Sequence, residues 1–134
     1  MFERLNKLSS EYTISRFMIS SVVPKIPFIE KEETLNYYSE GLGFELLSDW
    51  GDYLIMKKEG AELHFFHFPK LKPRKSDFMI YLRVSEGIEE FYQNVQEKGV
   101  KIHPNGPLEA KPWNQKEFSL IDPAGTLLTF GQAI

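Results

Sequence analysis

The chain has no cysteine among its 134 residues, and this absence removes several kinds of chemistry together. Without a thiol there is no disulfide, no thiolate metal ligand and no cysteine nucleophile. The first twenty residues include Glu3, Arg4 and Lys7 and leave no apolar stretch of the kind that directs export. No apolar run reaches the length of a membrane span. We therefore expect a cytoplasmic protein that does not associate with membranes.

The chain also lacks an excess of positive charge, because 16 basic and 19 acidic residues leave a formal net charge of −3. Phosphate binding by nucleic-acid-binding proteins depends on a basic stripe, which is missing here. The one basic cluster lies in a connector flanked by prolines and consists of Lys70, Lys72, Arg74 and Lys75. A solvated linker explains this cluster, so we expect no nucleic-acid partner.

Familiar catalytic signatures are missing as well. The sequence contains no nucleophile elbow, no phosphate-binding loop and no dinucleotide fingerprint. Carboxylates such as Glu45, Asp49 and Asp52 are present, but the sequence identifies no partner that would make one of them a general acid or base. We therefore expect that the protein is not an enzyme.

A hydrophobic content of 42% is enough for one domain with its own core, and a pattern of strands and helices repeats within it. In the first half, about residues 17–68, the pattern predicts a strand over 18–28 and a helix over 30–40. Three further strands are expected near residues 44–49, 52–58 and 61–68. A linker over residues 69–76 then leads to the second half.

The second half, about residues 77–134, repeats this order. Alternation of apolar and polar residues predicts a strand over 78–84, and a helix follows that Ser85 caps and Gly99 ends. Strands are expected over 100–103, 117–121 and 126–130. The sequence therefore predicts an α+β fold of two tandem βαβββ modules. Residues 1–16 precede it, and their helical spacing of apolar side chains predicts a short N-terminal arm that packs on the domain or on a partner.

The most informative segment runs from Lys111 to Gly131. It contains a loop in which Pro112 precedes Trp113, and then a β-hairpin whose turn begins at Asp122. Two upstream motifs accompany it, the pair Tyr37-Tyr38 and the run Leu42-Gly43-Phe44. Together they resemble the vicinal-oxygen-chelate superfamily, and within it the bleomycin-resistance type of drug-binding protein. The resemblance covers about residues 22–132. It implies two modules that form a curved mixed sheet around a concave ligand cleft, which a homodimer completes.

Many enzymes of this superfamily hold a divalent metal ion in the cleft, on four strand positions. The resemblance places Val23, Met79 and Thr129 at three of these positions and either His64 or Phe65 at the fourth. Valine and threonine are not useful ligands here, and methionine prefers soft metals. We therefore expect no metal and no cofactor.

The other histidines do not restore a metal site. His64 and His67 are separated by an odd number of residues within one predicted strand, so they point to opposite faces of the sheet. Histidines that are half-buried and hydrogen-bonded explain both. A metal-dependent lyase or dioxygenase of the same fold remains the alternative function, and it would require His64 together with ligands that the alignment does not reveal.

The resemblance assigns Trp113 to a role in stacking the planar bithiazole of bleomycin, with Tyr53 as an aromatic partner. The family usually has glycine after this tryptophan, whereas this chain has Asn114, which tolerates a left-handed backbone. Two rings can hold a planar heterocycle between them, at about 0.5–1.5 kcal/mol per offset pair beyond area burial. Packing against the core remains the alternative for both rings.

Further candidates surround these rings. Asp49 and Asp52, with Trp50 between them, offer an anionic surround for a cationic ligand, although solvated turn residues have the same pattern. His64 and Phe66 are expected to line the cleft. The resulting hypothesis is a metal-free protein that sequesters a planar cationic small molecule, with a bleomycin-type antibiotic first. A non-catalytic module that binds another aromatic metabolite, or a protein partner through the N-terminal arm, remains open.

Overall fold

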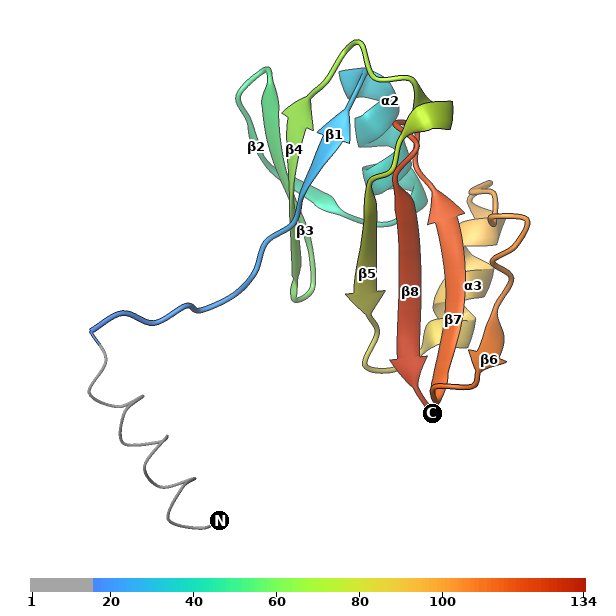
Figure 1. The fold of residues 1–134 in the computed structure, drawn as a ribbon. Helices are drawn as coiled ribbons and strands as arrows, with labels where there is room; N and C mark the ends of the chain where they lie inside the picture. Colours follow the sequence, from blue (N-terminus) through green and yellow to red (C-terminus); the bar gives the residue numbers. More distant parts are fainter. Residues whose placement is uncertain (1–15) are drawn as a thin grey trace.

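A computed structural model describes residues 16–134 and contains two four-stranded mixed sheets, one in each half of the chain (Figure 1). The predicted α+β fold with two tandem modules is thereby confirmed. The predicted N-terminal arm lies outside the described residues, apart from residue 16. Among the described residues, no helix is both long enough and apolar enough to span a membrane.

The first sheet has the strand order β1-β4-β3-β2 and is formed by residues 25–67. Its elements are β1 (Lys25–Phe28), α2 (Lys31–Leu35), a π-helical segment (Asn36–Gly41), β2 (Glu45–Asp49), β3 (Tyr53–Lys58) and β4 (Ala61–His67). β1 runs parallel to β4, and the other neighbours are antiparallel. The first module is therefore a βαβββ unit in which the last strand returns beside the first.

The second sheet repeats this topology in the order β5-β8-β7-β6, with β5 parallel to β8. A short 3-10 helix (Pro73–Lys75) lies in the linker before it. The remaining elements are β5 (Met79–Arg83), α3 (Ile88–Glu97), β6 (Glu109–Lys111), β7 (Gln115–Ile121) and β8 (Leu127–Ala133).

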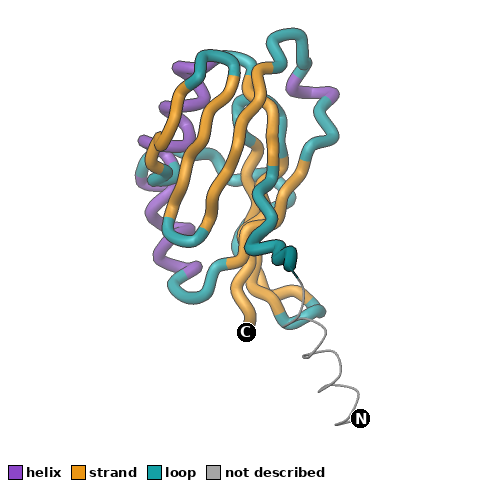
Figure 2. Tube along the Cα trace, turned by 90° about the vertical axis from the view of Figure 1, so that its left-hand side faces the viewer, coloured by secondary structure: helices purple, strands orange, loops and turns teal. Residues whose placement is uncertain are grey.

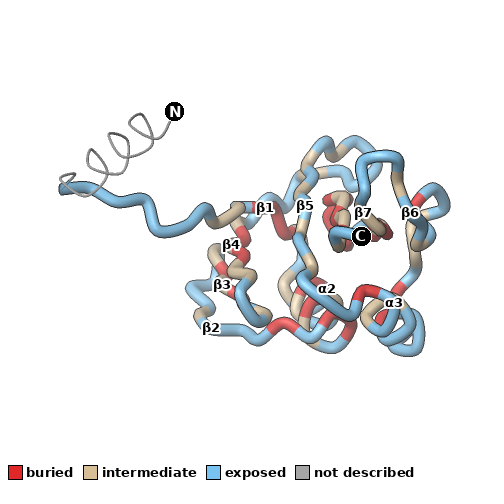
Figure 3. The backbone as a smooth tube through the Cα atoms, turned by 90° about the horizontal axis from the view of Figure 1, so that it is seen from below, coloured by how far each residue is buried: buried red, intermediate tan, exposed pale blue. Residues whose placement is uncertain are grey.

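Helices α2 and α3 lie along the same side of the molecule, and the strands lie beside them (Figure 2). Alternate strand residues point toward the helices and form the core, among them the fully buried Leu54, Phe65 and Leu120. Aromatic rings join helix and sheet, since Tyr38 packs edge-on against Phe65 with 4.8 Å between centroids. Buried segments occur in both modules (Figure 3). On the opposite face of each sheet, here called the open face, residues 16–134 place no helix.

Three local predictions were wrong. Of the strand predicted over residues 18–28, only Lys25–Phe28 pairs with a neighbour. Ser85 does not cap α3, because the helix begins at Ile88 after the left-handed Gly87, and the Ile88 amide donates to the Gln132 side chain at 3.0 Å. Residues 100–103 form no strand, and Glu109–Lys111 pairs with β7 instead.

A buried hydrogen bond joins the two modules. The hydroxyl of Tyr38, which is fully buried, donates to Asp122 Oδ2 at 2.6 Å. The other carboxylate oxygen of Asp122 accepts from the amides of Ala124 and Thr126, both at 2.9 Å, and so holds the turn before β8. Burial raises the pKa of Asp122, and these hydrogen bonds oppose the shift. The turn is therefore fixed from module one as well as from its own backbone.

Candidate ligand-binding site

Trp113 lies in the loop between β6 and β7 and is 60% exposed. The loop is a tight turn, closed by the Asn114 amide donating to the Lys111 carbonyl at 3.1 Å. Asn114 has φ 60°, the left-handed geometry expected of a residue that replaces glycine there. The turn therefore presents the indole to solvent.

A buried carboxylate fixes that indole. Glu117 is only 7% exposed, and its Oε2 accepts from Trp113 Nε1 at 2.9 Å and from the Tyr81 hydroxyl at 2.8 Å. Glu117 is on β7 and Tyr81 on β5, so the contact spans the open face of the second sheet. Partial burial raises the pKa of Tyr81, and the hydrogen bond to Glu117 adds to the shift. Two aromatic side chains are thus hydrogen-bonded to the same carboxylate.

The open face of the first sheet carries a second group of polar side chains joined by hydrogen bonds. The Tyr53 hydroxyl lies 2.7 Å from His64 Nδ1, and His64 Nε2 lies 2.7 Å from Glu62 Oε2. The Lys25 ammonium lies over the Tyr53 ring, 5.5 Å from its centroid. Tyr53 and His64 are therefore neighbours. Among the described residues, no ring contact joins Tyr53 to Trp113.

The predicted acidic surround is placed differently from the expectation. Asp49 accepts from Lys31 Nζ at 3.0 Å and from the Gly51 amide at 2.8 Å, and these contacts lower its pKa, the Gly51 bond most. Asp52 is exposed in the turn between β2 and β3, and Trp50 in that turn is 73% exposed. A lysine from α2 therefore already neutralises one of the two candidate acids.

Phe66 and the histidines settle the orientation of β4. Phe65 is fully buried in the core, so its neighbours His64 and Phe66 lie on the open face, and Phe66 packs against Phe78 with 5.9 Å between centroids. His67 bonds the Ile29 carbonyl at 3.0 Å. Within residues 16–134 no three His, Asp or Glu side chains are grouped to hold a metal ion, so the donor set does not fit a metal site.

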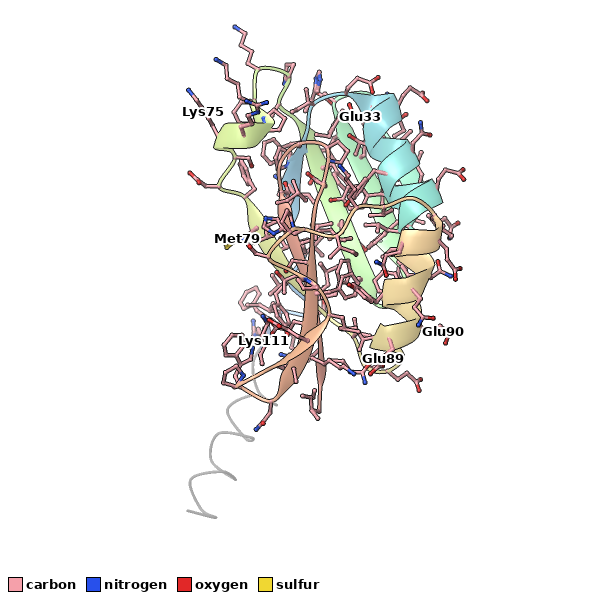
Figure 4. All side chains as sticks on the ribbon, turned by 90° about the vertical axis from the view of Figure 1, so that its right-hand side faces the viewer. Glu33, Lys75, Met79, Glu89, Glu90 and Lys111 are labelled. Atoms are coloured by element: carbon pink, nitrogen blue, oxygen red, sulfur yellow. The ribbon has the colours of Figure 1, made fainter. Side chains whose placement is uncertain are left out.

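A groove separates the two modules near the β3–β4 turn. Its lining includes Lys58, Glu62, Tyr81, Arg83, Glu86 and Phe91, but none of the eight residues nominated from the sequence. Each hydrogen-bonded group nevertheless contributes one residue to this lining, Glu62 from the first sheet and Tyr81 from the second. In Figure 4, Met79 of β5 lies on the side of module two away from Glu89 and Glu90 on α3.

Sequence reasoning missed Glu117, Tyr81 and Glu62. The alternating pattern of β5 put Tyr81 on one face of the strand with Met79. This pattern identified the face but not the residue that Tyr81 contacts. Glu117 gave no signal, because its contact with Trp113 depends on the left-handed turn at Asn114.

Comparison with known proteins places the chain. Residues 29–130 match the family model described as the Glyoxalase/Bleomycin resistance protein/Dioxygenase superfamily. The chain is similar to a bleomycin resistance protein of Klebsiella pneumoniae, 29% identical over 116 residues, which are 83% of this chain and 90% of that protein. A bleomycin resistance protein of Geobacillus stearothermophilus is 24% identical over 127 residues, which cover 84% and 96% of the two chains.

Solved structures show the same similarity. A crystal structure of a bleomycin-binding protein complexed with bleomycin superposes with a TM-score of 0.77 at 27% identity, covering 87% of this chain and 100% of that one. The bleomycin resistance determinant encoded on the transposon Tn5 superposes with a TM-score of 0.78 at 28% identity, covering 86% and 98%.

Proposed function

Because the chain belongs to the glyoxalase/bleomycin resistance protein/dioxygenase superfamily, we propose that it sequesters a planar cationic small molecule by binding it one-to-one, with a bleomycin-type antibiotic as the first candidate. The observation that carries this proposal is the exposed indole of Trp113, which a tight turn presents and a buried carboxylate fixes. A ring held in place loses little freedom when a flat ligand stacks on it.

The proposed site combines both open faces. Trp113, with Asn114 behind it, supplies the stacking surface of the second sheet, and Tyr53 with His64 and Phe66 supplies that of the first. Trp50, Asp49 and Asp52 form an outer rim, in which Asp52 is the acid without a lysine partner among the described ion pairs.

We propose that the protein is a homodimer and that a second copy brings the two surfaces together. Large apolar side chains are exposed on the open face of the second sheet, where Met79 is 68% and Tyr81 46% exposed. Sedimentation equilibrium is expected to give twice the chain mass of 15.6 kDa. A monomer at micromolar concentration would contradict this. The absence of cysteine fits a cytoplasmic location, which cell fractionation tests.

Sequestration and turnover are separated by drug recovery. Metal-free bleomycin is incubated with protein below one equivalent, free drug is removed by ultrafiltration, and the protein is denatured to release what it bound. Sequestration predicts that bound drug never exceeds one molecule per chain and is released with unchanged mass. Conversion of several drug molecules per chain would instead indicate an enzyme.

A second candidate keeps the site and changes the ligand. The Lys25 ammonium over Tyr53 and the Arg83 guanidinium 5.8 Å from the Tyr81 ring centroid put positive charge beside both aromatic surfaces. A planar aromatic carboxylate would pair with these cations. In a competition experiment, displacement of bleomycin by aromatic carboxylates, but not by aromatic amines, would favour this candidate.

A further inference from the structure

Glu117 is a carboxylate that the fold buries without using fully. Burying an ionised carboxylate is costly unless hydrogen bonds compensate for the lost water. Here both donors, Trp113 Nε1 and the Tyr81 hydroxyl, bind the same oxygen, Oε2, at 2.9 and 2.8 Å. Oε1 has no hydrogen-bond partner within the described part of the chain.

The free oxygen is not sealed inside the protein. Among the described side chains, Thr126 Oγ1 is the fully enclosed polar atom that lacks a partner, so Glu117 Oε1 is not completely enclosed. Trp113 and Tyr81 both donate to Oε2, the neighbouring oxygen of the same carboxylate. An acceptor beside two aromatic side chains is placed to meet the edge of a flat molecule lying on them.

Glycine at position 131 makes this arrangement possible. Gly131 pairs with Glu117 across the strands, and a β-carbon there would lie 1.6 Å from the Tyr81 hydroxyl and 3.2 Å from Glu117 Cγ. Only a residue without a side chain leaves room for the Tyr81 hydroxyl to reach Glu117. The contact between Tyr81 and Glu117 therefore depends on glycine at this position of β8.

We propose that Glu117 determines ligand specificity: it holds Trp113 and Tyr81 through one oxygen and offers the other to a cationic or N–H group at the edge of a planar ligand. This inference rests on the proposed function and names its anionic determinant. Asp49, nominated from the sequence for that role, is occupied by Lys31. A hydrogen bond between a cation and a partly buried carboxylate discriminates strongly, because a ligand without the donor leaves the charge unpaired.

Glu117→Gln separates the two roles. The amide oxygen can take the place of Oε2 and keep both aromatic partners, whereas the amide nitrogen puts a donor where Oε1 was an acceptor. The matched control is Glu97→Gln, which removes one negative charge from an exposed position on α3. Two metal-free probes are compared: bleomycin A2, which has a cationic tail, and bleomycinic acid, which ends in a carboxylate at that point.

Calorimetry is expected to show that Glu117→Gln weakens bleomycin A2 binding at least tenfold and changes bleomycinic acid binding less than threefold. Glu97→Gln should leave both affinities unchanged. An unchanged preference for bleomycin A2 in Glu117→Gln would overturn the inference while the proposed function stands. No binding of either probe by the wild type would instead refute the proposed antibiotic. The inference would then be tested by the accessibility of the Trp113 indole.

That second readout needs no ligand. In a Trp50→Phe background, Trp113 is the remaining tryptophan, and acrylamide quenching reports its accessibility. Glu117→Leu removes both hydrogen bonds and should raise the quenching constant at least twofold, whereas Glu117→Gln should match the parent. Equal quenching in all three proteins would show that Glu117 does not hold the indole and would overturn the inference. Circular dichroism identifies any variant that fails to fold.

Discussion

Replacing Tyr38 by phenylalanine tests the contact that joins the two modules. The ring stays in place, so its packing against Phe65 and Phe44 is kept and no cavity forms. What disappears is the hydroxyl that donates to Asp122 Oδ2 at 2.6 Å. Asp122 is 4% exposed, and water has little access to replace the lost donor. The substitution therefore leaves half of a buried carboxylate without a partner.

The size of the effect follows from the kind of hydrogen bond that is lost. Hydrogen bonds to charged groups contribute about 1.5–3 kcal/mol to stability. Asp122 Oδ1 keeps its two amide donors, so the turn before β8 should stay formed. We expect Tyr38→Phe to lower the free energy of unfolding by about 1.5–3 kcal/mol, which for a domain of this size lowers Tm by on the order of 5–12 °C.

Urea denaturation followed by circular dichroism at pH 7 measures this change. The control is Tyr92→Phe, because the centroid of the Tyr92 ring lies 5.1 Å from that of Phe118 and its hydroxyl has no hydrogen bond among the described contacts. That variant should stay within about 0.5 kcal/mol of the wild type. If Tyr38→Phe were as stable as Tyr92→Phe, the hydrogen bond to Asp122 would not be what holds the modules together.

Three further outcomes follow from the same structure. Gly125→Ala adds a β-carbon 2.2 Å from a linker carbonyl, at a residue with φ +86°, and should lower the free energy of unfolding by about 2–4 kcal/mol in a urea titration. Its control, Gly51→Ala, has φ +88° but open space and should lower that free energy by about 1–2 kcal/mol. Gly131→Ala should cost about 1–3 kcal/mol by displacing the tyrosine hydroxyl, whereas Gly60→Ala, also in open space, should cost less than about 0.5; equal losses would contradict the steric argument. Burial raises the pKa of Asp122 above its ordinary 3.8, so the folded state binds its proton more tightly than the unfolded state does. The stability of the wild type relative to Asp122→Asn should therefore fall as pH rises from about 4 through that raised pKa, and a difference that grows with pH would have the wrong sign.

The fold was largely predictable because its signals are local. Alternation identified β5, the hairpin around the Asp122 turn identified β7 and β8, and the turn from Asp122 to Gly125 formed with glycine in the left-handed region. Such features depend on residues close together in the sequence, so they can be recognised from a single sequence.

The errors have the opposite character. The amide that begins α3 is satisfied by Gln132, which lies 44 residues later, so no local pattern could replace Ser85 as the cap. β6 has no apolar residue except Ala110, and its strand geometry comes from pairing with β7. Tertiary pairing here outweighs local propensity.

The candidate site divides in the same way. Trp113 and Asn114 were identifiable from a motif within one loop, and the left-handed backbone at Asn114 was expected for the same reason. The partners of the site side chains were not identifiable. Lys31 pairs with Asp49 from 18 residues away, and Tyr81 reaches Glu117 from 36 residues away. Charges nominated from composition therefore need the structure to show which of them remain available.

Calorimetric titration with metal-free bleomycin, comparing the wild type, Trp113→Ala and Trp50→Ala, tests the central claim most directly. The account predicts saturable binding of one drug per chain, weakened at least tenfold by Trp113→Ala, which corresponds to about 1.4 kcal/mol. Trp50→Ala, which removes a more exposed indole from the rim, should have a smaller effect. Wild-type binding that Trp113→Ala leaves unchanged would contradict the account by placing the drug elsewhere.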